Sequence, residues 1–273
     1  MFDTIIHAQD LAQIIDQDNL CIFDCRFFLN DKSKGRQLYD KSHIPGASYA
    51  HLDNDLSGEI ISKVTGRHPL PNEADFEKWL QSRCVSNNDQ VIVYDQHHGG
   101  IAARLWWMMN WVGHKNVAVL NGGWDEWTNL DLPVSSERVQ GCRSDFKIHV
   151  NAGMVAPIDV VEKYSEDRND NLTDARANTR YHGINEPIDP VAGHIPGADS
   201  KQFIDNLTEQ KLWKSKDEVG ERFADKEDAI MYCGSGVTAC HNILAHKYAG
   251  LEVPRLYPGS WSEWIIDPKH RVG

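Results

Sequence analysis

The sequence has few cysteines, and none of them forms a Cys-x-x-Cys pair. Its 273 residues include six cysteines, at positions 21, 25, 84, 142, 233 and 240. A small secreted scaffold needs a much denser set of cysteines, and zinc or thioredoxin-type sites use closely spaced pairs. We therefore expect reduced thiols, with neither a metal nor an organic cofactor.

The sequence also lacks a long apolar run and a block of basic residues. A membrane-spanning helix needs about 20 apolar residues in succession. The stretch Met1-Phe2-Asp3-Thr4 has neither the basic region nor the apolar core of a signal peptide. Asp and Glu number 40 against 28 Lys and Arg, so the net charge is −12, which opposes binding to nucleic acid. These absences predict a cytoplasmic protein without a nucleic-acid or membrane partner.

What the sequence does contain is an internal duplication. Four landmarks occur twice in the same order: Asp-x-Arg at Asp24 and Asp174, His-Ile-Pro-Gly-Ala at His43 and His194, an apolar strand at Val91–Tyr94 and Ala229–Tyr232, and Trp-x-x-Trp at Trp124 and Trp261. A repeat of this length is a whole domain, because solenoid repeats are far shorter. We predict homologous domains at 1–135 and 155–273, joined by a polar linker at 136–154.

Short apolar segments alternate with helical patterns in each half. In the first half we expect strands at Cys21–Phe23 and Val117–Leu120 and a tryptophan-rich helix at Ala102–Trp111. This alternation predicts an α/β fold in which each domain has a parallel sheet flanked by helices. Four tryptophans of the repeated motif are expected to be packing anchors: Trp124, Trp127, Trp261 and Trp264.

The second half contains a cysteine at the point where a strand enters a helix. The apolar run Ala229–Tyr232 ends at Cys233, the glycine-rich stretch Gly234-Ser235-Gly236 follows, and a helical pattern begins at Val237. Such a loop directs backbone N–H groups at one point, at the positive end of a helix dipole, where they stabilise an anion. The sequence therefore predicts that Cys233 is an activated nucleophile, because the thiolate is the reactive form of cysteine.

The run Cys-Gly-Ser-Gly-Val-Thr-Ala resembles the active-site loop of the 3-mercaptopyruvate sulfurtransferases, a family within the rhodanese superfamily. This resemblance implies two tandem rhodanese-like domains and an enzyme that moves a sulfane sulfur from 3-mercaptopyruvate, through a persulfide on Cys233, to an acceptor. The acceptor would be cyanide or a thiol such as thioredoxin or glutathione. The loop would hold the small anionic donor through Gly234, Ser235, Gly236, Val237 and Thr238.

The resemblance also implies roles for side chains outside the loop. Arg180 stands where the family has a substrate-binding arginine, and a planar guanidinium suits a carboxylate. A set of Ser235, His43 and Asp31 would manage protons, with Asp40 as an alternative to Asp31. For His43 a structural role in the turn stays open, since the matching histidine of the second half occupies the same position.

Two features set limits to the resemblance. The first domain carries Asp95 where the second has Cys233, and an aspartate cannot carry a transferable sulfur, so we expect that domain to be catalytically silent. The family usually has a second substrate arginine in the segment before His-Ile-Pro-Gly, but residues 183–193 contain no arginine or lysine. The preferred donor therefore stays open.

Three other functions compete with this interpretation. A thiosulfate:cyanide sulfurtransferase is the nearest, although its family tends to have basic residues after the cysteine, where this chain is neutral. A cysteine phosphatase needs an arginine six residues after Cys233, and Ala239 stands there. A persulfide carrier fed by a protein partner also fits the loop. Cys240 is expected in the core, with a regulatory disulfide as the alternative.

Overall fold

The computed structural model describes residues 1–139, 143–167, 171–226 and 228–273, and its chain separates into two compact units. The first unit comprises Met1–Gly58, Pro71–Asn151 and Glu209–Trp213, and the second comprises Glu59–Leu70, Ala152–Thr208 and Lys214–Gly273. The boundary at residue 151 falls inside the predicted linker 136–154, of which residues 140–142 lie outside the described part. The sequence did not suggest that Glu59–Leu70 would belong to the second unit.

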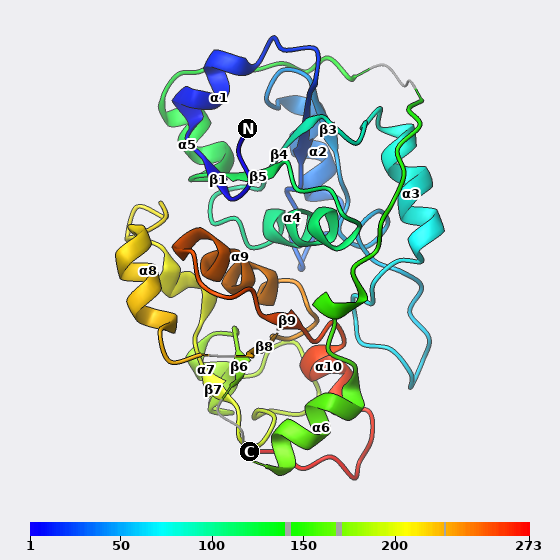
Figure 1. Ribbon diagram of the computed structural model, residues 1–273, viewed down its shortest axis with the longest axis vertical. Coiled ribbons are helices and arrows are strands. Elements are labelled where there is room, and N and C mark those ends of the chain that lie inside the picture. The colour runs from blue at the N-terminus through cyan, green and yellow to red at the C-terminus, as the bar shows by residue number, and fades with distance from the viewer. Residues whose placement is uncertain (140–142, 168–170, 227) are drawn as a thin grey trace. The chain divides into compact units, whose positions relative to one another are not determined.

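The first unit is built on a five-stranded parallel sheet with strand order β1-β5-β4-β2-β3 (Figure 1). Its strands are β1 (Ile5–Ile6), β2 (Leu20–Asp24), β3 (Ala47–Tyr49), β4 (Gln90–Tyr94) and β5 (Val117–Leu120), and its helices are α1 (Ala8–Ile14), α2 (Lys34–Lys41), α3 (Glu73–Ser82), α4 (Ala102–Trp111) and α5 (Gly123–Asn129). The helix and strand expected at 102–111 and 117–120 are confirmed with the same bounds.

Helices cover both faces of the first sheet. Side chains alternate along a strand, so Ile92 and Tyr94 share one face, where they pack with Leu11 of α1 and Trp127 of α5. On the other face α4 contacts β4 and β5, and nine of its ten residues are buried. A helix that is apolar all round requires such a covered position. The sheet is therefore shielded on both sides, as a parallel sheet requires.

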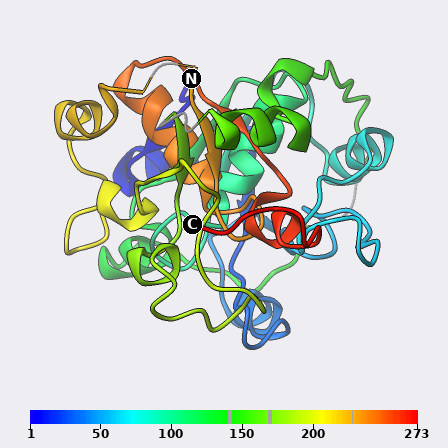
Figure 2. The same ribbon diagram turned by 90° about the horizontal axis from the view of Figure 1, so that it is seen from below.

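The second unit repeats this plan with a shorter parallel sheet, in the order β7-β6-β8-β9 (Figure 1; Figure 2 gives the view from below). Its strands are β6 (Leu172–Asp174), β7 (Asp199–Ser200), β8 (Ile230–Tyr232) and β9 (Arg255–Leu256), its α-helices are α6 (Ile158–Glu166), α7 (Asn178–Tyr181), α8 (Lys216–Phe223), α9 (Ala239–Ala249) and α10 (Ser260–Trp264), and two 3₁₀ turns are η1 (Ala152–Met154) and η2 (Phe203–Asn206). Residues of α6 and α10 pack on one face of β6 and β8.

The duplication extends to individual buried contacts. Asp24 and Arg26 form a buried ion pair of 2.6 Å, and Asp174 and Arg176 form one of 2.7 Å. The guanidinium of the first pair lies 4.4 Å from the ring of Trp124, and that of the second lies near Trp261. These contacts give both pairs a structural role, since each guanidinium also donates to a backbone carbonyl.

The repeated tryptophans are packing residues, as expected. Trp127, Trp261 and Trp264 are buried, and Trp124 packs against the first core while partly exposed. Among the described residues no helix is long and apolar enough to cross a bilayer.

The cysteines differ from the sequence-based expectation in one respect. Cys21, Cys25, Cys233 and Cys240 are free thiols, but Cys84 is disulfide-bonded. The expectation that all six thiols are reduced is therefore wrong for Cys84; Cys142 lies outside the described residues. Cys240 is buried and its sulfur lies 3.4 Å from the carbonyl oxygen of Gly236.

Candidate active site

Cys233 lies in the loop that follows β8 and is buried in the second unit. The residue is 2% exposed, and its backbone is fixed because its N–H donates to Ser260 and its carbonyl accepts from Trp261. Gly236 has a φ of +72°, and a Cβ there would lie 2.4 Å from the carbonyl oxygen of Pro258. Only glycine combines that conformation with that approach, so the tight turn expected from the sequence depends on Gly236.

The loop favours the ionised form of the Cys233 sulfur. Burial opposes ionisation, but hydrogen bonds from the Thr238 hydroxyl and from the backbone N–H groups of Ser235 and Ala239 outweigh it, so the pKa of Cys233 lies below that of an ordinary cysteine. The buried thiol Cys25 shows the contrast, because burial beside carboxylates raises its pKa well above the ordinary value. The hydrogen bonds of the loop thus give Cys233 the lowered pKa that favours a thiolate, whereas Cys25 lacks them and stays a thiol.

Ser235 is hydrogen-bonded to a histidine that the sequence reasoning missed. Its hydroxyl oxygen lies 2.7 Å from Nδ1 of His68, and both residues are buried. His68 belongs to Glu59–Leu70, the segment that joins the second unit from the first half of the sequence. The only sequence signal was the run Gly66-Arg67-His68, in which a glycine precedes two residues suited to a site.

The predicted proton-handling residues of the first half are not part of this arrangement. Both ring nitrogens of His43 lie near carbonyl oxygens, 2.7 Å from Tyr39 and 3.0 Å from Glu137. His43 stacks on the Tyr39 ring, as His194 of the second unit does on Tyr181. The prediction that His43 is the partner of Ser235 is therefore wrong, because His43 is the repeated turn histidine.

The aspartates proposed to support His43 have other partners. Asp31 is exposed and accepts hydrogen bonds from Ser33 and Lys34, which lower its pKa. Asp40 pairs with Arg36 and Arg138. Neither carboxylate contacts His43, so both assignments are corrected.

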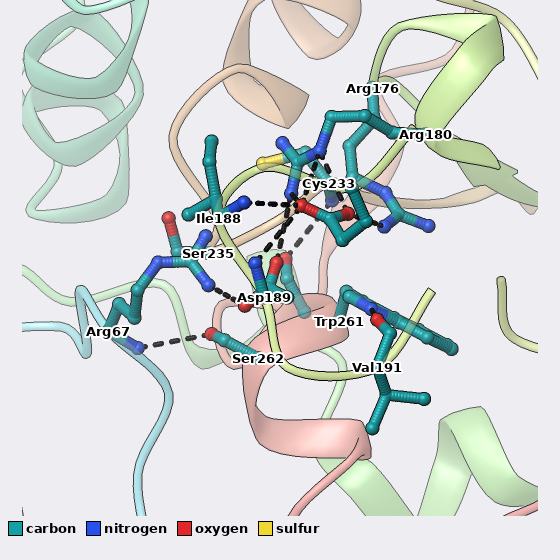
Figure 3. A network of polar contacts seen from close by, with 12 residues as sticks. Arg67, Arg176, Arg180, Ile188, Asp189, Val191, Cys233, Ser235, Trp261 and Ser262 are labelled. Carbon is teal, nitrogen blue, oxygen red and sulfur yellow. Dashed lines mark hydrogen bonds and ion pairs between the residues drawn. The ribbon is translucent and has the colours of Figure 1, made fainter. Parts of the chain in front are cut away.

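Arg180, to which the resemblance assigns substrate binding, lies beside the cysteine loop. Its Nε donates to both oxygens of Glu186, at 3.0 and 2.9 Å, and its Nη2 donates to Asp189 at 2.9 Å. A Cβ added to Gly234 would lie 3.3 Å from Nη2 of Arg180. Arg180 is thus bound to Asp189 (Figure 3), and its guanidinium lies against the residue that follows Cys233.

A second arginine reaches the same place. Arg67 pairs with the other oxygen of Asp189, and a Cβ on Gly234 would lie 2.9 Å from its Nη2. The resemblance implies a second arginine in residues 183–193, but that segment contains none. The structure supplies one from Glu59–Leu70, while residues 183–193 contribute the carboxylate, Asp189, that holds it (Figure 3).

The corresponding loop of the first unit holds a carboxylate in place of sulfur. Asp95 is buried and accepts hydrogen bonds from the backbone N–H groups of His97, Gly99, Ile101 and Ala102. Burial alone would raise the pKa of Asp95, but His98 and these N–H groups lower it. The first unit therefore retains a ring of N–H donors that is filled by its own side chain.

The adjacent histidines of that loop do not form a metal site. His97 lies 3.5 Å from Asp125. Within the described ranges no group of three or more His, Cys, Asp or Glu residues is arranged to hold a metal ion.

A nucleophilic cysteine in a ring of N–H groups, on one half of a duplicated parallel α/β fold, defines a cysteine-dependent group-transfer enzyme. The model of the rhodanese-like domain matches the chain twice, at residues 7–130 and 158–267. The chain therefore belongs to the rhodanese family, and it is a sulfurtransferase.

Several proteins named as sulfurtransferases are similar to this chain over nearly its whole length. A probable 3-mercaptopyruvate sulfurtransferase of Pseudomonas aeruginosa is 40% identical over 98% of this chain and 97% of its own. A thiosulfate sulfurtransferase of Cricetulus griseus is 33% identical over 100% of this chain and 96% of its own. The solved structure of an Escherichia coli 3-mercaptopyruvate sulfotransferase superposes with a TM-score of 0.83, at 29% identity, over 96% of this chain and 100% of its own. The expected two-domain fold is confirmed.

Proposed function

We propose that the enzyme takes sulfur from 3-mercaptopyruvate through a persulfide on Cys233. The observation that carries this proposal is the buried, ionisable Cys233 next to a hydrogen-bonded Ser235–His68 pair. The thiolate attacks the donor sulfur, a new S–S bond forms, and the carbon–sulfur bond of the donor breaks. The electron pair of that bond leaves with the three-carbon fragment as the enolate of pyruvate, which then takes up a proton.

The Ser235–His68 pair supplies the proton-handling groups for this step. A histidine titrates near neutral pH and can pass a proton through a serine hydroxyl at hydrogen-bond distance. We assign to His68 the role that the sequence had suggested for His43. His68 withdraws the thiol proton of the donor through Ser235 and returns it to the enolate carbon, so the step is balanced in protons.

A single carboxylate suits the rest of the site. Arg180 faces Gly234, and its planar guanidinium suits the carboxylate of a donor bound at the loop. The loop residues Gly234, Ser235 and Gly236 carry no charge, which favours a monoanion over the dianion thiosulfate. The 40% identical relative named for 3-mercaptopyruvate supports this choice of donor.

An acceptor completes the cycle by attacking the outer sulfur of the persulfide, which restores the Cys233 thiolate. We propose a thiol acceptor, thioredoxin or glutathione, with cyanide as an assay acceptor. Reduced thiols of this kind are abundant in the cytoplasm, which we propose as the compartment in which the enzyme works.

The experiment that tests the function is steady-state sulfur transfer to cyanide, with 3-mercaptopyruvate and thiosulfate compared in parallel. We expect kcat/KM to favour 3-mercaptopyruvate by at least about tenfold, equivalent to ~1.4 kcal/mol of transition-state stabilisation. Cys233→Ser should abolish transfer while Cys21→Ser, a free thiol of the first unit, leaves it unchanged.

The other outcomes identify the competing functions. A preference for thiosulfate would indicate a thiosulfate sulfurtransferase, as several relatives are named. If neither donor gives turnover that depends on Cys233, the chain is a persulfide carrier charged by a protein.

A further inference from the structure

Two guanidinium groups meet at the residue after the reactive cysteine. A Cβ atom added to Gly234 would lie 2.9 Å from Nη2 of Arg67. It would lie 3.3 Å from Nη2 and 3.4 Å from Nη1 of Arg180. The positive charge of Arg67 is also coupled to the Cys233 sulfur, since burial lowers the pKa of Arg67 and the thiolate raises it. Both cations therefore lie beside the residue that follows Cys233.

One carboxylate holds this pair of cations together. Asp189 has a side chain only 2% exposed, and it uses one oxygen for Arg67 and the other for Arg180. Its own N–H and that of Ile188 donate to Glu186 at 3.0 Å. Glu186 also accepts a hydrogen bond from Arg180, so it is itself held in place. Asp189 is therefore fixed through its backbone N–H as well as through its side chain, which Figure 3 shows between Arg67 and Arg180.

The segment that carries Arg67 is fixed independently. The N–H of Arg67 donates to the hydroxyl of Ser262 at 3.1 Å. A Cβ on Gly66 would lie 2.6 Å from the carbonyl oxygen of Gly259, so the backbone at Gly66 packs directly against the start of α10. Arg67 is thus placed by its backbone and only then paired with Asp189.

Arg67 retains hydrogen-bonding capacity that Asp189 does not use. Asp189 accepts from Nη1. The Nε is buried and has no hydrogen-bond partner among the described residues. The Nη2 donates to no acceptor within the described ranges and faces Gly234. Nε and Nη2 form the edge of a guanidinium that binds a carboxylate through two parallel hydrogen bonds.

The arginines near the loop are balanced by acidic residues. Arg176 pairs with Asp174 and Glu186, and the remaining two arginines share Asp189. Three guanidinium groups therefore face three carboxylates. A site so balanced binds an anion through directed hydrogen bonds and gives little extra attraction to a second negative charge.

We propose that Arg67 is the second donor-binding cation and that Asp189, which bridges Arg67 and Arg180, makes the site selective for a donor with one negative charge. Arg67 takes the place of the arginine that residues 183–193 lack, and the ion pair with Asp189 neutralises part of the positive charge of Arg67. The inference rests on the sulfur-transfer function proposed above and names the residues that decide between its two donors.

Two substitutions test the two halves of the inference. Arg67→Gln should raise KM for 3-mercaptopyruvate by at least about tenfold while kcat changes less than about threefold, because a binding contact is lost. Asp189→Asn keeps the size of the side chain and removes its charge. It should raise the ratio of kcat/KM for thiosulfate to that for 3-mercaptopyruvate by about tenfold, since the dianion gains more from the unmasked charge.

The controls remove the same charges elsewhere in the second unit. Arg255 and Asp228 form a partly exposed ion pair of 3.1 Å, so Arg255→Gln and Asp228→Asn should leave KM and the donor ratio unchanged. An unchanged KM in Arg67→Gln, or an unchanged ratio in Asp189→Asn, would overturn the inference even if Cys233-dependent transfer is strong.

A binding measurement keeps the inference testable if turnover is absent. In the Cys233→Ser background, calorimetry with pyruvate as the monocarboxylate probe and thiosulfate as the dianion probe requires no chemistry. We expect Arg67→Gln to weaken pyruvate binding by about tenfold, and Asp189→Asn to strengthen thiosulfate relative to pyruvate. Equal effects on both probes would contradict the role of Asp189. Failure of the proposed function would instead be seen as absent turnover in the unmodified enzyme.

Discussion

At the scale of single residues, the reactivity of Cys233 depends on a few hydrogen bonds that offset its burial. The Thr238 hydroxyl donates a side-chain hydrogen bond that lowers its pKa, while Ser235 and Ala239 contribute backbone N–H groups. A side chain can be replaced without moving the backbone, so Thr238 is the position at which this balance can be tested.

Thr238→Val is expected to raise the pKa of Cys233. The pKa of the folded enzyme is lowered, so the thiolate forms below the pH of an ordinary cysteine, and loss of the hydroxyl moves that transition to higher pH. The thiolate fraction at neutral pH should fall by roughly tenfold, the size of a lost hydrogen bond to a charged group. The rate of iodoacetamide alkylation against pH measures it.

Thr173→Val is a matched control for this experiment. The Thr173 hydroxyl is buried in the same unit and has no hydrogen-bond partner among the described residues. The same chemical change there should leave the alkylation profile in place. A profile that does not move in Thr238→Val would show that the Thr238 hydroxyl does not lower the pKa of Cys233.

Which site residues the sequence could reveal depends on how far apart they lie along the chain. Cys233, Ser235 and Thr238 are within one short loop, whose glycines record its geometry directly. Arg180 was placed only by resemblance. His68 contacts Ser235 across 167 positions, and no local pattern encodes such a contact. The repeated His-Ile-Pro-Gly motif instead drew attention to His43.

At the scale of elements, long apolar patterns predicted helices and strands well, and short segments less so. The helix at 102–111 is mostly apolar, with nine of its ten residues buried, and the sequence predicts it with its observed bounds. The two-residue strands β7 and β9 are too short to show a period of two. The strand–loop–helix around Cys233 was predicted, but α9 begins two residues later than expected, at Ala239, because Val237 and Thr238 belong to the loop.

Helix α8 illustrates how an element is stabilised at its end. The Ser215 hydroxyl accepts from the N–H of Glu218, and the Glu218 carboxylate accepts from the N–H of Ser215 at 3.0 Å. Ser215→Ala should lower the free energy of unfolding by ~1 kcal/mol, without changing sulfur transfer. Urea unfolding followed by circular dichroism measures the loss. Ser33→Ala is the comparison, since Ser33 makes no cap hydrogen bond to α2 and its hydroxyl contacts the exposed side chains of Asp31 and Gln37, so its loss should be smaller.

At the scale of the whole molecule, the two equivalent loops of the duplicated chain differ, because only the loop of the second unit carries a cysteine. The first unit keeps the sheet, the Asp24–Arg26 pair and a ring of N–H donors, but Asp95 fills that ring. The landmarks that were predictable from the sequence are those needed for folding, and they are present in both halves. At the matching loop position the halves differ, with Asp95 in the first and Cys233 in the second, and an aspartate cannot carry a transferable sulfur.

One sulfur per chain is therefore expected at saturation with donor. Cyanide-releasable sulfur should be about one per chain in the unmodified enzyme and about zero in Cys233→Ser. Adding Asp95→Cys to Cys233→Ser should not restore it, because Asn30 stands at the position that matches Arg180. A second sulfur in that double variant would mean that the loop alone suffices for transfer.

The assignment of Glu59–Leu70 to the second unit has a consequence for the ancestry of the chain. His68 and Arg67 are encoded in the first half of the gene, yet they complete the unit encoded by the second half. A fission of the gene at the linker would leave a fragment with the nucleophile but without its histidine, and a complementary fragment with the histidine but no nucleophile. We therefore expect the two halves to be inherited as one gene.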